Sequence, residues 1–317
     1  MKNINQKVFI DSNFKGWILE GIVKESAVKI ERKIEIQFLN FSLRNIETLL
    51  RYLFKYRIKV HLGDLVVNQG TLFKLVDLRM IGIQDLELID CFFTHDSIKN
   101  LREKRRAVVL QKVRKIKVMN IRDAKMLINL GIAPDKILVV YGAIDREKFY
   151  PLDEYNPSNS FVYVTGDAKE RKNPQKILDM VDYNPDLNFI INGRFWNRYI
   201  MNIGYKLPNN LNIIEDLSLN PVLMRNASAF VNLSRNEGGP YPVLESLASG
   251  TPVLATEVGW NTELISRKNG RLVHQEENQK QIRNLLIETL DLKQNVYHQD
   301  LLEGRFTWSD LAIKLYN

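Results

Sequence analysis

Short apolar runs alternate along the chain with longer segments in which apolar residues recur at helical spacing. Near the N-terminus, residues 7–11 predict a strand, a helix opens at Trp17, and residues 33–41 predict a second strand. Ser42 can cap the next helix, and further apolar runs lie around Val60 and Val66. This alternation favours a parallel sheet covered by helices on both faces. The remaining expected elements of this half are strands at 88–93, 116–119 and 137–141 and a helix over 122–130.

A polar, turn-rich stretch over residues 146–160 interrupts the alternation. The pattern then restarts with a strand at 161–165 and a helix that has Asn173 as its cap and Pro174 as its first residue. Later strands are expected at 188–192, 211–214 and 229–233, with a short helix beginning at Asn220. Two consecutive α/β units joined by a linker predict two Rossmann-like domains whose strand ends face a ligand cleft. The expected boundaries are 1–145 for the first domain, 146–160 for the linker and 161–305 for the second domain.

Residues 236–255 are the most informative segment, because they predict a loop, a helix and a buried strand in succession. Pro242 suits the first helical position, and Gly250 stands where a left-handed residue ends a helix. Glu237 lies just before this helix and Glu245 lies within it, with seven residues between them. Gly238 and Gly239 lie between the carboxylates, where a backbone without side chains lets a ligand approach closely.

The start of this helix also favours an anion, because backbone N–H groups and the positive end of the helix dipole meet there. Two acids that accept hydrogen bonds from hydroxyls, next to a cradle for an anion, suit a molecule that carries both hydroxyls and phosphates. A nucleotide sugar is such a molecule.

The segment resembles the E-x7-E signature of glycosyltransferase family 4, whose members are retaining enzymes. The resemblance implies an α/β protein with the GT-B fold, in which two Rossmann-like domains with parallel sheets face each other across a cleft. Other motifs follow in the family's order: residues 139–151 are similar to the interdomain segment, and residues 258–265 to the loop after the E-x7-E strand. Residues 306–308 look like the start of the last helix, so residues 306–317 are expected to pack back on the N-terminal domain.

The resemblance also implies roles for single residues. Glu245 would accept hydrogen bonds from the donor ribose, and Glu237 would position the sugar and stabilise its developing positive charge. Lys172, which follows Gly166 as in the family's phosphate loop, would bind the diphosphate. His95 would face the donor sugar and the acceptor, although a loop histidine bonded to its neighbour stays an open alternative. The other expected donor-binding residues are Gly16, Gly166, Arg171, Ile214, Glu215, Gly238, Gly239, Val243 and Leu244.

Two departures from the family pattern affect these expectations. Asp167 stands where the family has an arginine, and Arg171 is the preferred second cation because it adjoins Lys172. Gly239 and Pro240 stand where the family often has an aromatic residue and a glycine, which would alter the sugar preference. Two alternatives stay open, and Asp167 supports the second. One is an epimerase or hydrolase that needs no acceptor, and the other is a protein that binds a nucleotide sugar without turning it over.

Charge suggests a further partner. The formal net charge is +8, and the positive excess lies in residues 1–150, most densely in residues 99–117. This basic segment allows a solvated helix face, or attraction to an anionic membrane surface or a phosphorylated acceptor. Nucleic acid is the least favoured partner, because the segment lacks aromatic residues for base stacking.

Composition excludes several other classes. A single Cys91 cannot form an internal disulfide, which indicates a reducing compartment. No stretch reads as a signal peptide or a membrane span, so we expect a cytoplasmic protein, with peripheral association at the inner membrane face left open. The four histidines lack metal-site spacing and no Asp-x-Asp occurs, which predicts a reaction without metal or cofactor. The sequence thus predicts transfer from a UDP- or GDP-sugar to a glycan, lipid-linked or small-molecule acceptor.

Overall fold

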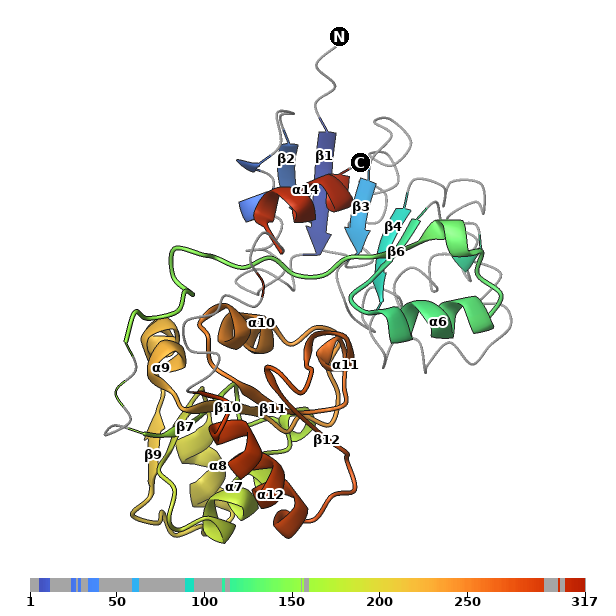
Figure 1. Ribbon diagram of the computed structural model, residues 1–317. Helices are drawn as coiled ribbons and strands as arrows, with labels where there is room; N and C mark the ends of the chain where they lie inside the picture. The colour runs from blue at the N-terminus through green and yellow to red at the C-terminus, as the bar shows by residue number, and fades with distance from the viewer. Residues whose placement is uncertain are drawn as a thin grey trace. The chain divides into compact units, whose positions relative to one another are not determined.

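The computed structural model of the chain describes residues 6–11, 24–26, 28–29, 34–39, 59–62, 89–93, 110–111, 115–154, 156, 160–293, 302 and 306–316. The chain divides into two compact units, residues 1–143 with 307–317 and residues 144–306. Each unit contains a six-stranded sheet, and neighbouring strands are parallel throughout (Figure 1).

The sheet of the first unit has the order β2-β1-β3-β4-β5-β6. Helix α6 begins after Asn120, whose side-chain oxygen accepts a hydrogen bond from the backbone N–H of Asp123 at 2.8 Å. The helices expected at Trp17 and after Ser42 lie outside the described residues. The elements are β1 (Gln6–Asp11), β2 (Ile34–Leu39), β3 (Lys59–Leu62), β4 (Ile89–Phe93), β5 (Lys115–Val118), α6 (Ile121–Asn129), η4 (Pro134–Lys136), β6 (Ile137–Val139) and α14 (Trp308–Tyr316).

The sheet of the second unit has the order β12-β11-β10-β7-β8-β9. Its strands are β7 (Val162–Thr165), β8 (Phe189–Asn192), β9 (Leu211–Ile214), β10 (Ala229–Asn232), β11 (Val253–Thr256) and β12 (Gly270–Val273). Its helices are η6 (Glu170–Lys172), α7 (Pro174–Tyr183), α8 (Trp196–Asn202), η7 (Leu217–Leu219), α9 (Asn220–Asn226), α10 (Tyr241–Ala248), α11 (Asn261–Leu264) and α12 (Gln279–Leu290).

This strand order places a switch point in the middle of the second sheet. The chain enters at β7, moves outward through β8 and β9, and then returns to β10 on the other side of β7. Loops leaving β7 and β10 therefore start side by side at the carboxyl ends of two neighbouring strands. Open α/β sheets bind ligands at such a point.

Helices cover both faces of the second sheet. Helices α7, α8 and α12 share one apolar core with the strands, and α7 packs against α12. Helices α9 and α10 pack against each other and contact β7, β10 and β11 (Figure 1). Strands β7, β10 and β11 are buried at every position, as expected for parallel strands covered on both faces.

The strands expected in the second half of the chain are confirmed, with shifts of a residue at some ends. Two helix starts differ from expectation. Helix α10 begins at Tyr241, so Pro242 is its second residue. Asn173 does precede α7, but it has a left-handed backbone with φ of 56° and no capping hydrogen bond. Its side-chain oxygen instead accepts a hydrogen bond from Nε of Arg235 at 3.2 Å. None of the described helices combines the length and the apolar character that crossing a membrane requires.

Candidate functional site

The candidate site lies where the chain leaves β7 and β10. Strand β7 leads through Gly166 into η6, and β10 leads into the loop of residues 233–240 that ends at α10. The two strands are adjacent, with Val164 paired to Val231, so their following loops meet. A backbone hydrogen bond of 2.8 Å from Arg235 N to Arg171 O joins the loops directly. The fold thus brings η6 and the residues before α10 to one place.

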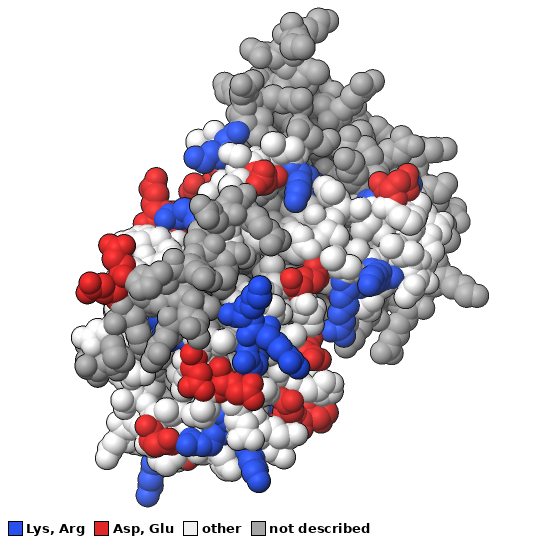
Figure 2. Space-filling view, viewed as in Figure 1, with Lys and Arg blue, Asp and Glu red and all other residues white. Residues whose placement is uncertain are grey.

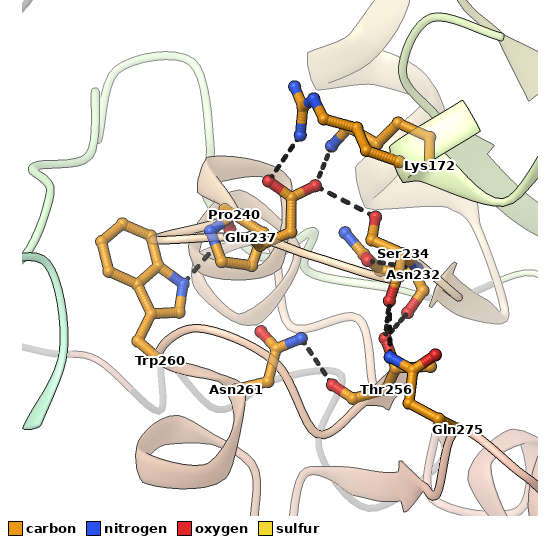
Figure 3. A network of polar contacts seen from close by, with 10 residues as sticks. Lys172, Asn232, Ser234, Glu237, Pro240, Thr256, Trp260, Asn261 and Gln275 are labelled. Carbon is orange, nitrogen blue, oxygen red and sulfur yellow. Dashed lines mark hydrogen bonds and ion pairs between the residues drawn. The ribbon is translucent and has the colours of Figure 1, made fainter. Parts of the chain in front are cut away.

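The carboxylate of Glu237 is held by two cations at this junction. Arg171 Nη1 lies 2.9 Å from Oε2, and Lys172 Nζ donates to Oε1. Ser234 Oγ also lies 3.0 Å from Oε1 (Figure 3). The side chains of Glu237 and Lys172 are only 9% and 14% exposed, whereas that of Arg171 is 51% exposed. We call Arg171 and Lys172 the cationic pair.

Burial alone would raise the pKa of Glu237, but the positive charges of Lys172 and Arg171 and the hydrogen bonds outweigh it and hold the pKa below its ordinary value. Glu237 is therefore ionised at neutral pH. The cationic pair gathers two positive charges on adjacent residues, which is an arrangement that can bind a phosphate anion.

Gly166 lies beside the Lys172 side chain in a turn that requires glycine. Its φ of 129° favours glycine, and a Cβ there would lie 3.6 Å from Lys172 Cε. The carbonyl oxygen of Gly166 also packs against Gly193, where an added Cβ would lie only 2.1 Å from it. Trp196 Nε1 donates to the same oxygen at 2.8 Å. The turn after β7 is therefore fixed by backbone packing against the turn after β8.

Asp167 stands where the family has an arginine, and its charge is neutralised by the side chain of Arg194. Arg194 grips its carboxylate with Nε at 3.1 Å and Nη2 at 2.9 Å. Lys169 Nζ adds an ion pair of 3.2 Å. Burial would raise the pKa of Asp167, but these partners hold it below its ordinary value. Sequence reasoning missed Arg194, because only the pairing of β7 with β8 brings it to Asp167.

Glu245 has a very different environment. Burial raises its pKa to about 7. Among the described residues no group donates a hydrogen bond to its carboxylate. The nearby Tyr163 phenol has its pKa raised to about 12 by burial, with a contribution from the charge of Glu245. Glu245 is half-buried, and its carboxylate is a hydrogen-bond acceptor without a donor among the described residues.

Beside Glu245 lies a buried polar cluster that sequence reasoning did not single out. Asn220 Oδ1 accepts hydrogen bonds from Tyr163 Oη at 2.5 Å, from Asn192 Nδ2 at 2.9 Å and from Thr165 Oγ1 at 3.2 Å. Asn192 also donates to the backbone oxygen of Asp216 at 2.7 Å. The signal was present, since Thr165 and Asn192 each end an apolar strand with a polar residue. This cluster fixes the carboxyl ends of β7, β8 and β9.

The glycines between the two acids pack against the loop after β11. A Cβ on Gly239 would lie 2.3 Å from Cζ3 of Trp260, and a Cβ on Gly259 would lie 2.6 Å from Gly238 O. Trp260 is fully buried and its Nε1 donates to Pro240 O at 3.3 Å (Figure 3). The structure thus gives a reason for Gly239 that the sequence did not: the indole ring occupies the space of a side chain.

The remaining predicted residues differ in accessibility. Val243 and Leu244 are fully buried. Ile214 is half-buried, and the carboxylate of Glu215 accepts a hydrogen bond from Asn197 N at 3.2 Å, in the first turn of α8. Gly16, His95 and most of the basic segment lie outside the described residues.

The described surface carries basic and acidic side chains close together on the face that Figure 2 draws. No group of three or more His, Cys, Asp or Glu residues in the described part of the chain is placed to hold a metal ion.

Comparisons with known proteins give one family. Residues 135–299 match the family described as glycosyl transferases group 1. An uncharacterized glycosyltransferase of Methanocaldococcus jannaschii is 27% identical over 163 residues, which make up 50% of this chain and 44% of that protein. The match therefore spans less than half the length of this relative.

Solved structures resemble the chain over nearly its whole length. HepE of Anabaena in complex with UDP-glucose has a TM-score of 0.70 at 13% identity, with 98% of each chain covered. Sucrose-phosphate synthase of Thermosynechococcus elongatus has a TM-score of 0.71 at 14% identity, covering 98% of this chain and 97% of that one. The lipopolysaccharide outer core galactosyltransferase WaaB has a TM-score of 0.62 at 15% identity, with 98% of each chain covered. At such low identity the likeness establishes the fold, which is GT-B.

Proposed function

The chain belongs to the glycosyl transferases group 1 family, and on this premise we propose that it transfers a sugar from a UDP- or GDP-sugar to an acceptor hydroxyl. One observation carries the proposal. At the switch point of the second sheet, the cationic pair lies next to an ionised Glu237, and the unpaired carboxylate of Glu245 follows on α10. Cations for a diphosphate and acceptors for hydroxyls are the two kinds of group that a nucleotide sugar requires.

In this proposal Glu245 binds the ribose. Its carboxylate has no donor among the described residues, and two neighbouring hydroxyls of a ribose would supply donors. A hydrogen bond to a charged group contributes about 1.5–3 kcal/mol. The raised pKa of Glu245, about 7, means that its charge is costly until such donors arrive. Ligand binding would therefore favour the ionised form.

The cationic pair neutralises the leaving group. As the bond between the sugar C1 and the phosphate oxygen breaks, negative charge grows on the nucleoside diphosphate, and Lys172 and Arg171 stabilise it. The acceptor oxygen forms the new bond to C1 on the same face, and its proton passes to the departing phosphate oxygen. Glu237 positions the sugar hydroxyls and stabilises positive charge at C1. Retention of configuration is the stereochemical outcome of this route.

The relatives support a particular donor class. HepE was solved in complex with UDP-glucose, which favours a UDP-sugar as the first donor to test. The acceptor proposal is broader: a glycan, a lipid-linked saccharide or a small molecule in surface polysaccharide synthesis. The basic segment, residues 99–117, supports an acceptor that is itself anionic or held at an anionic membrane face. His95 stays the predicted contact to sugar and acceptor.

A thermal-shift titration tests the donor site. Wild type, Glu245→Ala and Glu288→Ala are titrated with UDP, GDP and ADP and with their sugar conjugates. Glu288 is the matched control, because its carboxylate is 55% exposed and pairs with Arg271 on the surface. We expect one nucleotide to raise the melting temperature of wild type and of Glu288→Ala. Glu245→Ala should bind it about tenfold more weakly.

Two results would redirect the proposal. Release of free sugar at the same rate with and without acceptors would favour a hydrolase. Tight binding of a donor that stays intact with every acceptor offered would favour a protein that binds the nucleotide sugar alone. Absence of any nucleotide response in wild type would contradict the donor site itself.

A further inference from the structure

Glu237 already fills the anion position between the cations that the proposed function assigns to the diphosphate. It accepts from Arg171 Nη1 at 2.9 Å and from Lys172 Nζ through its two different oxygens. An incoming diphosphate would compete for the same two donors. The carboxylate is 9% exposed, so this competition occurs where solvent screens little.

The surroundings of Glu237 allow an exchange of partners. Ser234 Oγ lies 3.0 Å from Oε1, so the carboxylate keeps one hydrogen bond when the cations turn away. Arg171 is 51% exposed, so its guanidinium has room to move toward a ligand. Lys172 can rotate about its long stem while its methylenes stay against Gly166, where the nearest approach to an added Cβ is 3.6 Å. In Figure 3, Lys172 and Ser234 both approach Glu237, and both contact its Oε1.

We propose that Glu237 is an internal counter-ion of the cationic pair, which a diphosphate displaces when it binds. The proposal rests on the proposed function for the identity of the ligand as a nucleoside diphosphate. Its charge logic is simple. A single carboxylate balances part of the cationic charge, whereas a diphosphate carries more negative charge and more acceptor oxygens. The exchange therefore favours a diphosphate and disfavours anions with a single charge.

The displacement also has a consequence for the sugar. Once the cationic pair moves to the phosphates, the Glu237 carboxylate loses two of its three partners and becomes an acceptor for sugar hydroxyls. Seating of the diphosphate would thus release the group that positions the sugar. Glu237 lowers the affinity for the diphosphate and contributes to transfer. Removing its charge should therefore raise the affinity for the diphosphate and lower the rate of transfer.

Isothermal titration calorimetry with inorganic pyrophosphate tests the exchange without a base or a sugar. The proteins are wild type, Glu237→Gln and the control Glu170→Gln. Glu170 carries the same charge and lies on η6 beside the cationic pair, but it is 93% exposed and lies 3.7 Å from Arg235. We expect Glu237→Gln to bind pyrophosphate about tenfold more tightly than wild type, because the Glu237 carboxylate no longer competes with pyrophosphate for the cationic pair. The control should stay within about twofold, since exposed ion pairs contribute little.

A second variant and a second probe complete the test. Glu237→Asp shortens the side chain, so its carboxylate cannot reach both cations, and pyrophosphate should again bind more tightly. UDP and GDP should follow pyrophosphate, while Glu237→Gln lowers kcat for transfer. Equal or weaker pyrophosphate binding by both folded variants would overturn the counter-ion. If wild type binds neither UDP nor GDP while the variants still gain pyrophosphate affinity, the counter-ion stands and the proposed donor fails.

Discussion

At the scale of single residues, the two glutamates of the site hold opposite charge environments within one short segment. Lys172 and Arg171 hold the pKa of Glu237 low, whereas burial without a partner raises the pKa of Glu245 to about 7. The carboxylate of Glu237 therefore already has charged hydrogen-bond partners, whereas that of Glu245 has no donor among the described residues. Titratable groups with shifted pKa values concentrate where a ligand binds, because the ligand supplies the hydrogen-bond partners that the folded protein alone does not provide.

The raised pKa of Glu245 predicts a pH-dependent stability. The native state keeps the proton up to about pH 7, whereas the unfolded chain loses it near the ordinary value of 4.5. The native state binds more protons in this window, so the stability that Glu245 contributes falls as pH rises through it. Glu245→Gln should therefore be more stable than wild type above pH 7, by ~3 kcal/mol. The difference should shrink toward zero below the ordinary pKa.

Urea denaturation of both proteins across this pH range measures the difference. Because the other carboxylates titrate equally in wild type and variant, their contributions cancel. A difference that does not change with pH would mean that Glu245 titrates normally. The same variant should lose nucleotide affinity, so stability and binding would change in opposite directions.

The residue pattern revealed some of these partners and concealed others. Glu237, Lys172 and Arg171 were all expected at the donor site, because the family resemblance assigns the acid to the sugar and the cations to the diphosphate. The ion pairs that they form with one another were not foreseen. The pairing of Asp167 with Arg194 could not be foreseen, since it depends on how closely the turns after β7 and β8 approach. The roles of His95 and Gly16 stay predictions.

At the scale of elements, the loop before α10 and the loop after β11 act as one packed unit. Trp260 lies fully buried against Gly239 and its ring is 5.6 Å from that of Tyr241. The family's aromatic residue at position 239 has no room here, because Trp260 already occupies the space. Loss of either partner should therefore alter the path of the segment that carries Glu237.

A double-mutant cycle on Gly239 and Trp260 tests this coupling. Gly239→Ala should destabilise the protein by ~1–3 kcal/mol, because its Cβ would lie 2.3 Å from the ring. Trp260→Ala should cost ~3–5 kcal/mol through the cavity that it leaves. Once the ring is gone, the added methyl group meets open space, so the double variant should be more stable than the sum implies.

Chemical denaturation of the four proteins gives the interaction free energy of the cycle. Additive effects would show that Gly239 is required for another reason, such as ligand approach. If that reason is ligand approach alone, Gly239→Ala would leave stability nearly unchanged and would weaken nucleotide binding instead.

Element positions were readable from the sequence where strong local signals coincide. Short apolar runs gave β7 to β11 within a residue or two, and glycine or proline marks one end of β7, β8 and β11. The Asn173 cap was misjudged in its chemistry, because its side chain bonds Arg235 from a distant loop rather than the helix N–H groups. The residue preferences at a helix start do not reveal a hydrogen-bond partner that lies far away in the sequence.

At the scale of the whole molecule, the sequence predicted the architecture through the alternation of elements and the order of motifs. The alternation indicated two parallel sheets, and the motif order indicated the GT-B fold; both are confirmed. Strand order within each sheet was not readable, because it depends on contacts between segments far apart in the sequence. The order is nevertheless what creates the switch point, by placing β10 beside β7.

The whole chain also supports a prediction about metal dependence. No Asp-x-Asp occurs anywhere in the sequence, while the switch point presents Lys172 and Arg171 for the leaving group. If side-chain cations neutralise the diphosphate, removal of divalent ions by EDTA should leave donor binding and transfer unchanged within about twofold. Addition of Mg²⁺ or Mn²⁺ should restore nothing. Lys172→Ala, by contrast, should lower kcat/KM by about tenfold or more, because a charged hydrogen bond to the leaving group is lost. A loss of turnover with EDTA that Mg²⁺ reverses would instead assign the diphosphate charge to a metal, and the cationic pair would then serve Glu237 alone.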